Sequence, residues 1–92
     1  MDLGNPVTQS DMNIMPLRPD IEEEIMQCHL EAKWAKAQRF FEANIRHPSL
    51  HTELLEPHWR GIYSFRLDRK YRALFFITNG QAEVFKITKH YQ

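Results

Sequence analysis

Two arginines on either side of a short turn are the residues of this chain best placed to do chemistry. Arg66 and Arg72 lie in segments that read as adjacent antiparallel strands, so their side chains can converge if both face the same side of the sheet. Two guanidinium groups at one place can bind a phosphate. A second interpretation stays open, in which both arginines are exposed and paired with Glu83 or Asp68. In both interpretations we expect Arg72 to be exposed and to contribute little to stability.

The end of the chain holds a second set of reactive groups. Lys89, His90 and Tyr91 directly follow a predicted strand. A histidine can give or take a proton near neutral pH, a tyrosine ring can stack on a nucleotide base, and the lysine adds positive charge. Because chain ends are often disordered, the interpretation that this pair has no function also stays open.

The charge of the chain is unevenly distributed, although its formal net charge is zero. Residues 1–58 hold five Lys/Arg against ten Asp/Glu, and residues 59–92 hold seven against two. A polyanion would therefore bind the second half, and the turn residues Arg69 and Lys70 join Arg66 as candidate contacts to its phosphates. Alternatively, acidic helices and a basic sheet simply neutralise each other.

Other kinds of site find little support in the sequence. It has no glycine-rich phosphate loop and no Ser-His-Asp set, and Pro48 prevents a helix that would bring His47 and His51 onto one face as metal ligands. We therefore expect no metal and no cofactor. Cys28 is the only cysteine, which fits a reducing compartment. No apolar run is long enough to span a membrane, and we expect no signal peptide because residues 1–13 are polar. These features predict a cytoplasmic protein without membrane contact.

The first half of the chain must supply the helices that support this basic segment. We expect a flexible tail over 1–12 and a single domain over 13–92 that begins with an edge strand at 13–17. The apolar stripe then changes phase, which predicts two helices, 19–28 and 30–45, packed as a hairpin. Neither glycine nor proline marks the break, so one long helix is the alternative.

The second half changes to a period of two residues, which is typical of strands. We predict strands at 62–67, 71–78 and 82–88, the last two joined by a tight turn at Asn79 and Gly80. The expected fold is α+β in the order β-α-α-β-β-β, with an N-terminal helical hairpin packed on a small antiparallel sheet.

The stretch HPSLHTELLEPHWRGIYSFRLDRKYRALFF and the terminal ITKHYQ resemble the RelE/ParE toxins over residues 17–92. The end of the chain is similar to the YoeB-like mRNA interferases, whose catalytic group is a glutamate, an arginine and a C-terminal His-Tyr. That pattern falls on Glu53, Arg72, His90 and Tyr91. The YafQ-like branch has histidines in this region, and its pattern is only partly met.

The resemblance implies a type II toxin that cuts mRNA on the ribosome and inhibits translation, with a cognate antitoxin as its partner. Glu53 would be the general base, His90 the general acid, Arg72 with Arg66 the phosphate clamp, and Tyr91 a positioning group. One rival is a ParE-like inhibitor of DNA gyrase, which shares the fold and performs no RNA chemistry. Another is a degenerate toxin that only binds its antitoxin or self-associates as a homodimer.

Overall fold

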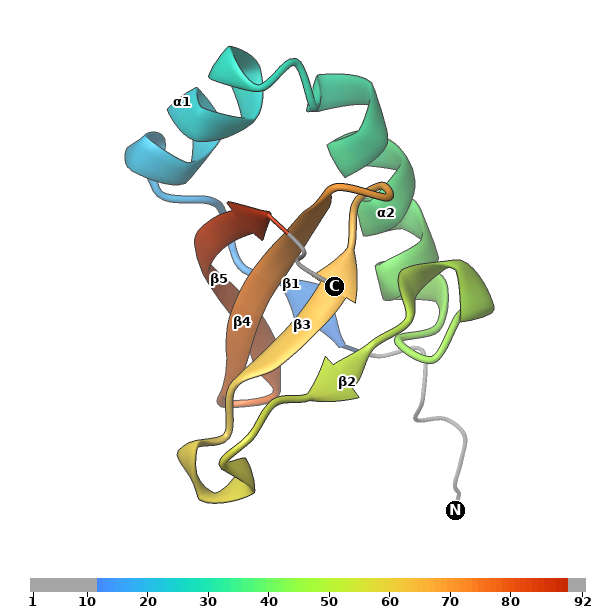
Figure 1. The fold of residues 1–92 in the computed structure, drawn as a ribbon. Helices are drawn as coiled ribbons and strands as arrows, with labels where there is room; N and C mark the ends of the chain where they lie inside the picture. The colour runs from blue at the N-terminus through green and yellow to red at the C-terminus, as the bar shows by residue number, and fades with distance from the viewer. Residues whose placement is uncertain (1–11, 90–92) are drawn as a thin grey trace.

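The computed structural model describes residues 12–89, which form two helices and a five-stranded sheet (Figure 1). The predicted α+β class is therefore confirmed. In chain order the elements are β1 (Asn13–Ile14), α1 (Pro19–Gln27), α2 (Glu31–Ala43), a 3₁₀ turn (Pro48–Leu50), β2 (Glu53–Leu54), a second 3₁₀ turn (His58–Arg60), β3 (Tyr63–Arg66), β4 (Tyr71–Thr78) and β5 (Gln81–Lys89).

The sheet is mixed, and the prediction of an antiparallel sheet is wrong at one edge. Its strand order is β1-β5-β4-β3-β2, with β1 parallel to β5 and the other pairs antiparallel. The edge strand predicted over 13–17 is only two residues long, since Pro16 has no N–H to continue the ladder. The short strand β2 at the opposite edge was not predicted.

Two helices form, as the phase shift predicted, and the break between them lies at His29. This residue adopts a left-handed backbone conformation with φ of 57°. The amide of Leu30 donates to the carbonyl of Ile25, and the amide of His29 donates to that of Met26, at 2.8 and 3.1 Å. This is the Schellman arrangement that usually has glycine at the left-handed position. No helix within residues 12–89 is long and apolar enough to cross a membrane.

The helices diverge from this break and cover one face of the sheet (Figure 1), so they do not form the closely packed hairpin that the sequence predicted. The core lies between them and the sheet, where Phe41 of α2 meets Phe65 and Phe75 at ring-centroid distances of 5.2 and 5.3 Å. Trp34, which is also in α2, packs against Phe65. Because side chains alternate along a strand, residues next to these phenylalanines face away from the helices.

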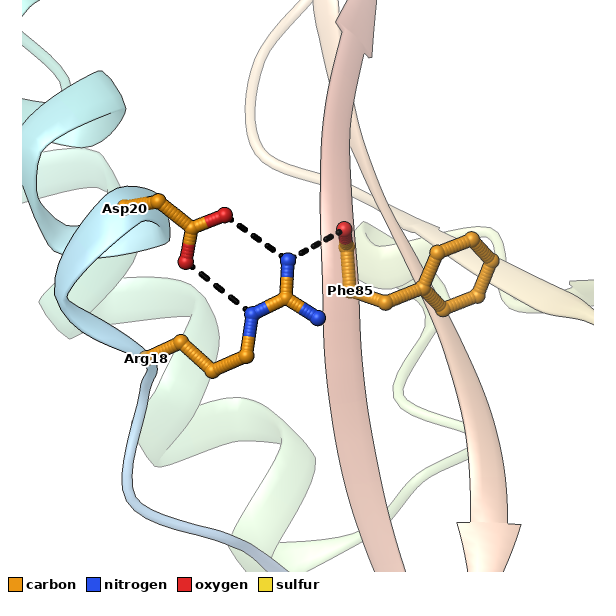
Figure 2. Close-up of polar contacts among 3 residues, drawn as sticks. All are labelled: Arg18, Asp20 and Phe85. Atoms are coloured by element: carbon orange, nitrogen blue, oxygen red, sulfur yellow. Dashed lines mark hydrogen bonds and ion pairs between the residues drawn. The ribbon is translucent and has the colours of Figure 1, made fainter.

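The start of α1 is tied to β5 by one arginine. The guanidinium of Arg18 donates two hydrogen bonds to Asp20, at 3.0 and 2.8 Å, and one at 3.5 Å to the carbonyl of Phe85 (Figure 2). The hydrogen bond from Arg18 lowers the pKa of the Asp20 carboxyl. The acid in the first turn also lies near the positive end of the helix dipole.

The turn from β3 to β4 is organised by Asp68. Its carboxylate accepts hydrogen bonds from the amides of Lys70 and Tyr71 and from the Lys33 ammonium, at 2.8, 2.7 and 2.8 Å. Burial raises the pKa of this carboxyl, but the bond from Lys33 and the two amides outweigh it, so that the pKa lies below its ordinary value. This turn sets the register that places Arg66 opposite Arg72.

We therefore expect Asp68→Ala to lower the free energy of unfolding by about 1–2 kcal/mol, because it removes three hydrogen bonds from a mostly buried carboxylate. Since the pKa of Asp68 is depressed on folding, this stability is present above about pH 4 and is lost as the pH falls further. Urea unfolding at pH 7 and pH 3 measures both effects. Asp20→Ala is the matched control, and a difference between the two variants that persisted unchanged at pH 3 would contradict the role given to Asp68.

Candidate active site

Arg66 and Arg72 are direct cross-strand partners in the β3–β4 pair. Each lies next to a residue that is buried under the helices, Phe65 and Ala73 respectively. Both arginines therefore lie on the sheet face that the helices leave open. The predicted convergence of these two side chains is confirmed by the register, whereas their pairing with Glu83 or Asp68 is not seen among residues 12–89.

Arg72 is buried, so the prediction that it is exposed is wrong, and the expectation that it contributes little to stability loses the exposure on which it was based. Its side chain is only 7% exposed. Nε donates to the Ser64 hydroxyl at 2.9 Å, and Nη2 donates to the backbone carbonyl of His51 at 2.7 Å. The segment that contains His51 lies against the guanidinium, which no local pattern around Arg72 could reveal. Arg72 therefore supports the structure as well as being available for chemistry.

Glu53 forms an ion pair with Arg72. Strand β2 pairs with β3 so that Glu53 lies opposite Ser64, which places the glutamate on the same face as Arg72. Its Oε2 lies 3.5 Å from Arg72 Nη2, and its side chain is 56% exposed. The carboxylate is thus positioned by a buried cation and remains accessible to a ligand from solvent.

These groups surround one hollow with a volume of about 350 Å³, lined by His51, Thr52, Glu53, Arg66 and Arg72. Three of the predicted site residues therefore share one cavity. His51 and Thr52 were not predicted as site residues. No local pattern marked His51, because its backbone is left-handed, with φ of 46°, and does not continue the alternation of β2.

The other predicted residues do not join this hollow or lie outside the described part of the chain. Arg69 and Lys70 are exposed in the β3–β4 turn. Thr88 is the cross-strand partner of Arg72, so the next residue, Lys89, lies on the face of the sheet opposite to the hollow. His90 and Tyr91 fall outside residues 12–89.

The hollow is electrostatically positive, with two guanidinium groups and one carboxylate. Burial lowers the pKa of Arg72, nearby Glu53 raises it, and Arg66 lowers it further. An arginine keeps its charge despite such shifts, because its intrinsic pKa is far above neutrality. The surplus positive charge favours an anionic ligand in the hollow.

No protein-family model matches this chain, and a search of the curated proteins finds no match. The chemistry of the hollow must therefore be argued from its own residues. Among residues 12–89 no group of His, Cys, Asp and Glu side chains is arranged to hold a metal ion. The hollow offers a carboxylate that can accept a proton and a cation that can bind a phosphate, and His51 is among the residues that line it.

Proposed function

We propose that this protein is a type II toxin of the RelE/ParE superfamily that cuts mRNA on the ribosome. The observation that best supports this is the position of the Glu53 carboxylate, 3.5 Å from Arg72 and open to the hollow. A base beside a phosphate-binding cation is what RNA cleavage without a metal requires. The resemblance to the YoeB-like branch assigns the same two residues to the catalytic group.

Glu53 is the general base in this proposal. It takes the proton from a ribose 2′-hydroxyl, whose oxygen then attacks the adjacent phosphorus. The exposed carboxylate can reach a ribose at the mouth of the hollow, while its ion pair with Arg72 orients it. Because the 2′-hydroxyl is the attacking group, the proposed substrate is RNA and DNA is not cut.

Arg72 stabilises the charge that develops on the attacked phosphate. Nε donates to Ser64 and Nη2 to His51, and no hydrogen bond from Nη1 to a protein atom is found among residues 12–89. An arginine has five N–H donors in a rigid plane, so the two N–H groups of Nη1 are available for phosphate oxygens. Arg66 supplies a second positive charge on the same face.

The acid that protonates the departing 5′-oxygen is His90 in this proposal, and Tyr91 positions the substrate. Both assignments rest on the resemblance. The proposed partners are the ribosome, its mRNA and a cognate antitoxin, whose acidic segment would cover the Arg66 and Arg72 face in the cytoplasm.

Mapping of transcript ends tests the proposal. Added to translating ribosomes, the protein should generate new mRNA ends, and it should cut the same RNA poorly when ribosomes are absent. Growth arrest with inhibited gyrase and uncut mRNA would instead select the ParE-like activity. Neither arrest nor cleavage at matched expression would select a degenerate toxin.

Deleting residues 90–92 should reduce cleavage at least on the order of 100-fold, because it removes the proposed acid and the positioning ring. The buried residues of the described core all precede Lys89, so the shortened chain should unfold near the wild-type midpoint. Deleting Gln92 alone is the matched control and should leave cleavage intact. Full cleavage by the chain without residues 90–92 would show that another group is the acid, and His51, which lines the hollow, would be the next candidate.

A further inference from the structure

A second hollow lies between helix α2 and the end of β3. It has a volume of about 300 Å³ and is lined by Lys33, Lys36, Ala37, Phe40, Ser49, Leu50, Arg66, Leu67 and Asp68. For comparison, a water molecule occupies about 30 Å³ in the liquid, so a sugar-phosphate unit can be accommodated here. We call this cavity the α2 groove.

Arg66 lines both the α2 groove and the hollow that contains Glu53 and Arg72. The two cavities therefore share Arg66 as a lining residue. A ligand that extends from the proposed cleavage site past Arg66 would next reach the α2 groove. A linear polyanion has this shape, since its charges repeat along a single chain.

The charges in the α2 groove favour an anion. Lys33 is already paired with Asp68 at 2.8 Å. Lys36 and Arg66, by contrast, form no ion pair among residues 12–89. Arg66 is half-buried and has the like charge of Arg72 beside it, so an anionic ligand would relieve the repulsion between the two guanidinium groups.

Lys36 and Phe40 lie next to each other in the lining of this groove. Its Nζ lies 5.8 Å from the centroid of the Phe40 ring. That ring is stacked on His47 at 3.9 Å with an interplanar angle of 7°. Because His47 covers one face of the Phe40 ring, that face cannot stack on a nucleotide base, and the ring instead serves as a packing contact for Lys36. The geometry thus points to a phosphate contact at Lys36.

We propose that Lys36 and Arg66 bind a second phosphate of the RNA, adjacent along the strand to the phosphate that is cut. This inference rests on the proposed function. Lys36 is a positioning residue, because it contacts neither the reacting atoms nor Glu53. The position of the α2 groove beside the cleavage hollow favours RNA, since a strand that is cut in the hollow continues on both sides of the cut phosphate.

Binding of uncleavable RNA tests this directly. Fluorescence anisotropy would be measured with a 2′-O-methyl dinucleotide, which has one internal phosphate, and with a 2′-O-methyl hexanucleotide. Lys36→Gln should weaken hexanucleotide binding about fivefold and leave dinucleotide binding unchanged. It should also reduce the slope of log affinity against log salt by about 0.7, the value for one phosphate contact on a single strand.

Arg39→Gln is the matched control. It removes one positive charge from an exposed position of the same helix, outside the α2 groove. This variant should bind both RNAs as the wild type does. Equal weakening by Lys36→Gln and Arg39→Gln would show a general charge effect and overturn the subsite.

Two further outcomes separate the subsite from the function. Wild-type hexanucleotide binding that Lys36→Gln leaves unchanged would overturn the subsite alone, and it would leave an acidic peptide as the occupant of the α2 groove. A wild-type protein that bound neither RNA, even at low salt, would overturn the subsite, whereas the absence of new mRNA ends on translating ribosomes would overturn the proposed function.

Discussion

Glu53→Gln should reduce the rate of ribosome-dependent mRNA cleavage by about 10²- to 10⁴-fold and leave the fold intact. The amide keeps the shape of the side chain but cannot accept the proton of the 2′-hydroxyl. Its effect on the free energy of unfolding should stay within about 0.5 kcal/mol, because the side chain is 56% exposed and its ion pair is partly screened. The measurement is the rate at which new mRNA ends appear, per folded molecule.

Glu56→Gln provides the matched control for this prediction. Glu56 is three residues further along, is 83% exposed, and pairs with His58 rather than with an arginine of the hollow. It should cut mRNA at the wild-type rate. If Glu53→Gln also cut at that rate, Glu53 would not be the base. The proposed mechanism would then lose its general base, the carboxylate that is paired with Arg72.

The periodic parts of the fold could be predicted from the sequence because local patterns determine them. Alternation of apolar residues located β3, β4 and β5 to within one residue at each end. The apolar stripe located both helices, although the second ends earlier than predicted, at Ala43. The break between the helices was predicted from the phase shift alone, because the left-handed position, where glycine is typical, is held by His29.

The short edge strands could not be predicted in the same way. Strands β1 and β2 are two residues long, so they have no periodic pattern to detect. Each exists because a longer neighbouring strand offers it a hydrogen-bonding edge. The parallel pairing of β1 with β5 depends in addition on how the two helices return the chain to the sheet, which is a property of the whole fold.

The candidate site was only partly predictable for the same reason. The register of one hairpin places Arg66 opposite Arg72, and a short turn specifies that register. The burial of Arg72 depends on His51, which lies 21 residues away in the chain. Local sequence predicts which side chains share a sheet face, but it does not predict which of them a distant segment covers.

Arg72→Ala should therefore lower the free energy of unfolding by about 2–4 kcal/mol. The substitution leaves the Ser64 hydroxyl and the His51 carbonyl without their donor, and it leaves Glu53 without its counter-ion. Such a loss is a large part of the stability of a domain this small. Loss of toxicity by this variant would not distinguish a missing phosphate clamp from an unfolded protein.

Arg72→Lys makes the two roles separable. A lysine keeps the positive charge but lacks the planar fork that donates to Ser64, to His51 and to a phosphate at once. We expect it to fold with a smaller loss of stability, about 1–2 kcal/mol, and to cut mRNA about 10²- to 10³-fold more slowly per folded molecule. Urea unfolding gives the folded fraction, and transcript-end mapping at the same temperature gives the rate.

Arg66→Lys is the control that shows whether the planar guanidinium of Arg72 contributes to cleavage beyond its charge. The two arginines are cross-strand partners on one face, yet only Arg72 donates a side-chain hydrogen bond among residues 12–89. Arg66→Lys should keep its stability within about 0.5 kcal/mol and slow cleavage far less than Arg72→Lys. If Arg66→Lys and Arg72→Lys slowed cleavage equally, the contribution of Arg72 would come from its charge alone and not from its planar hydrogen-bonding geometry. Wild-type cleavage by a folded Arg72→Lys would remove Arg72 from the chemistry and leave it as a buried support for the segment around His51.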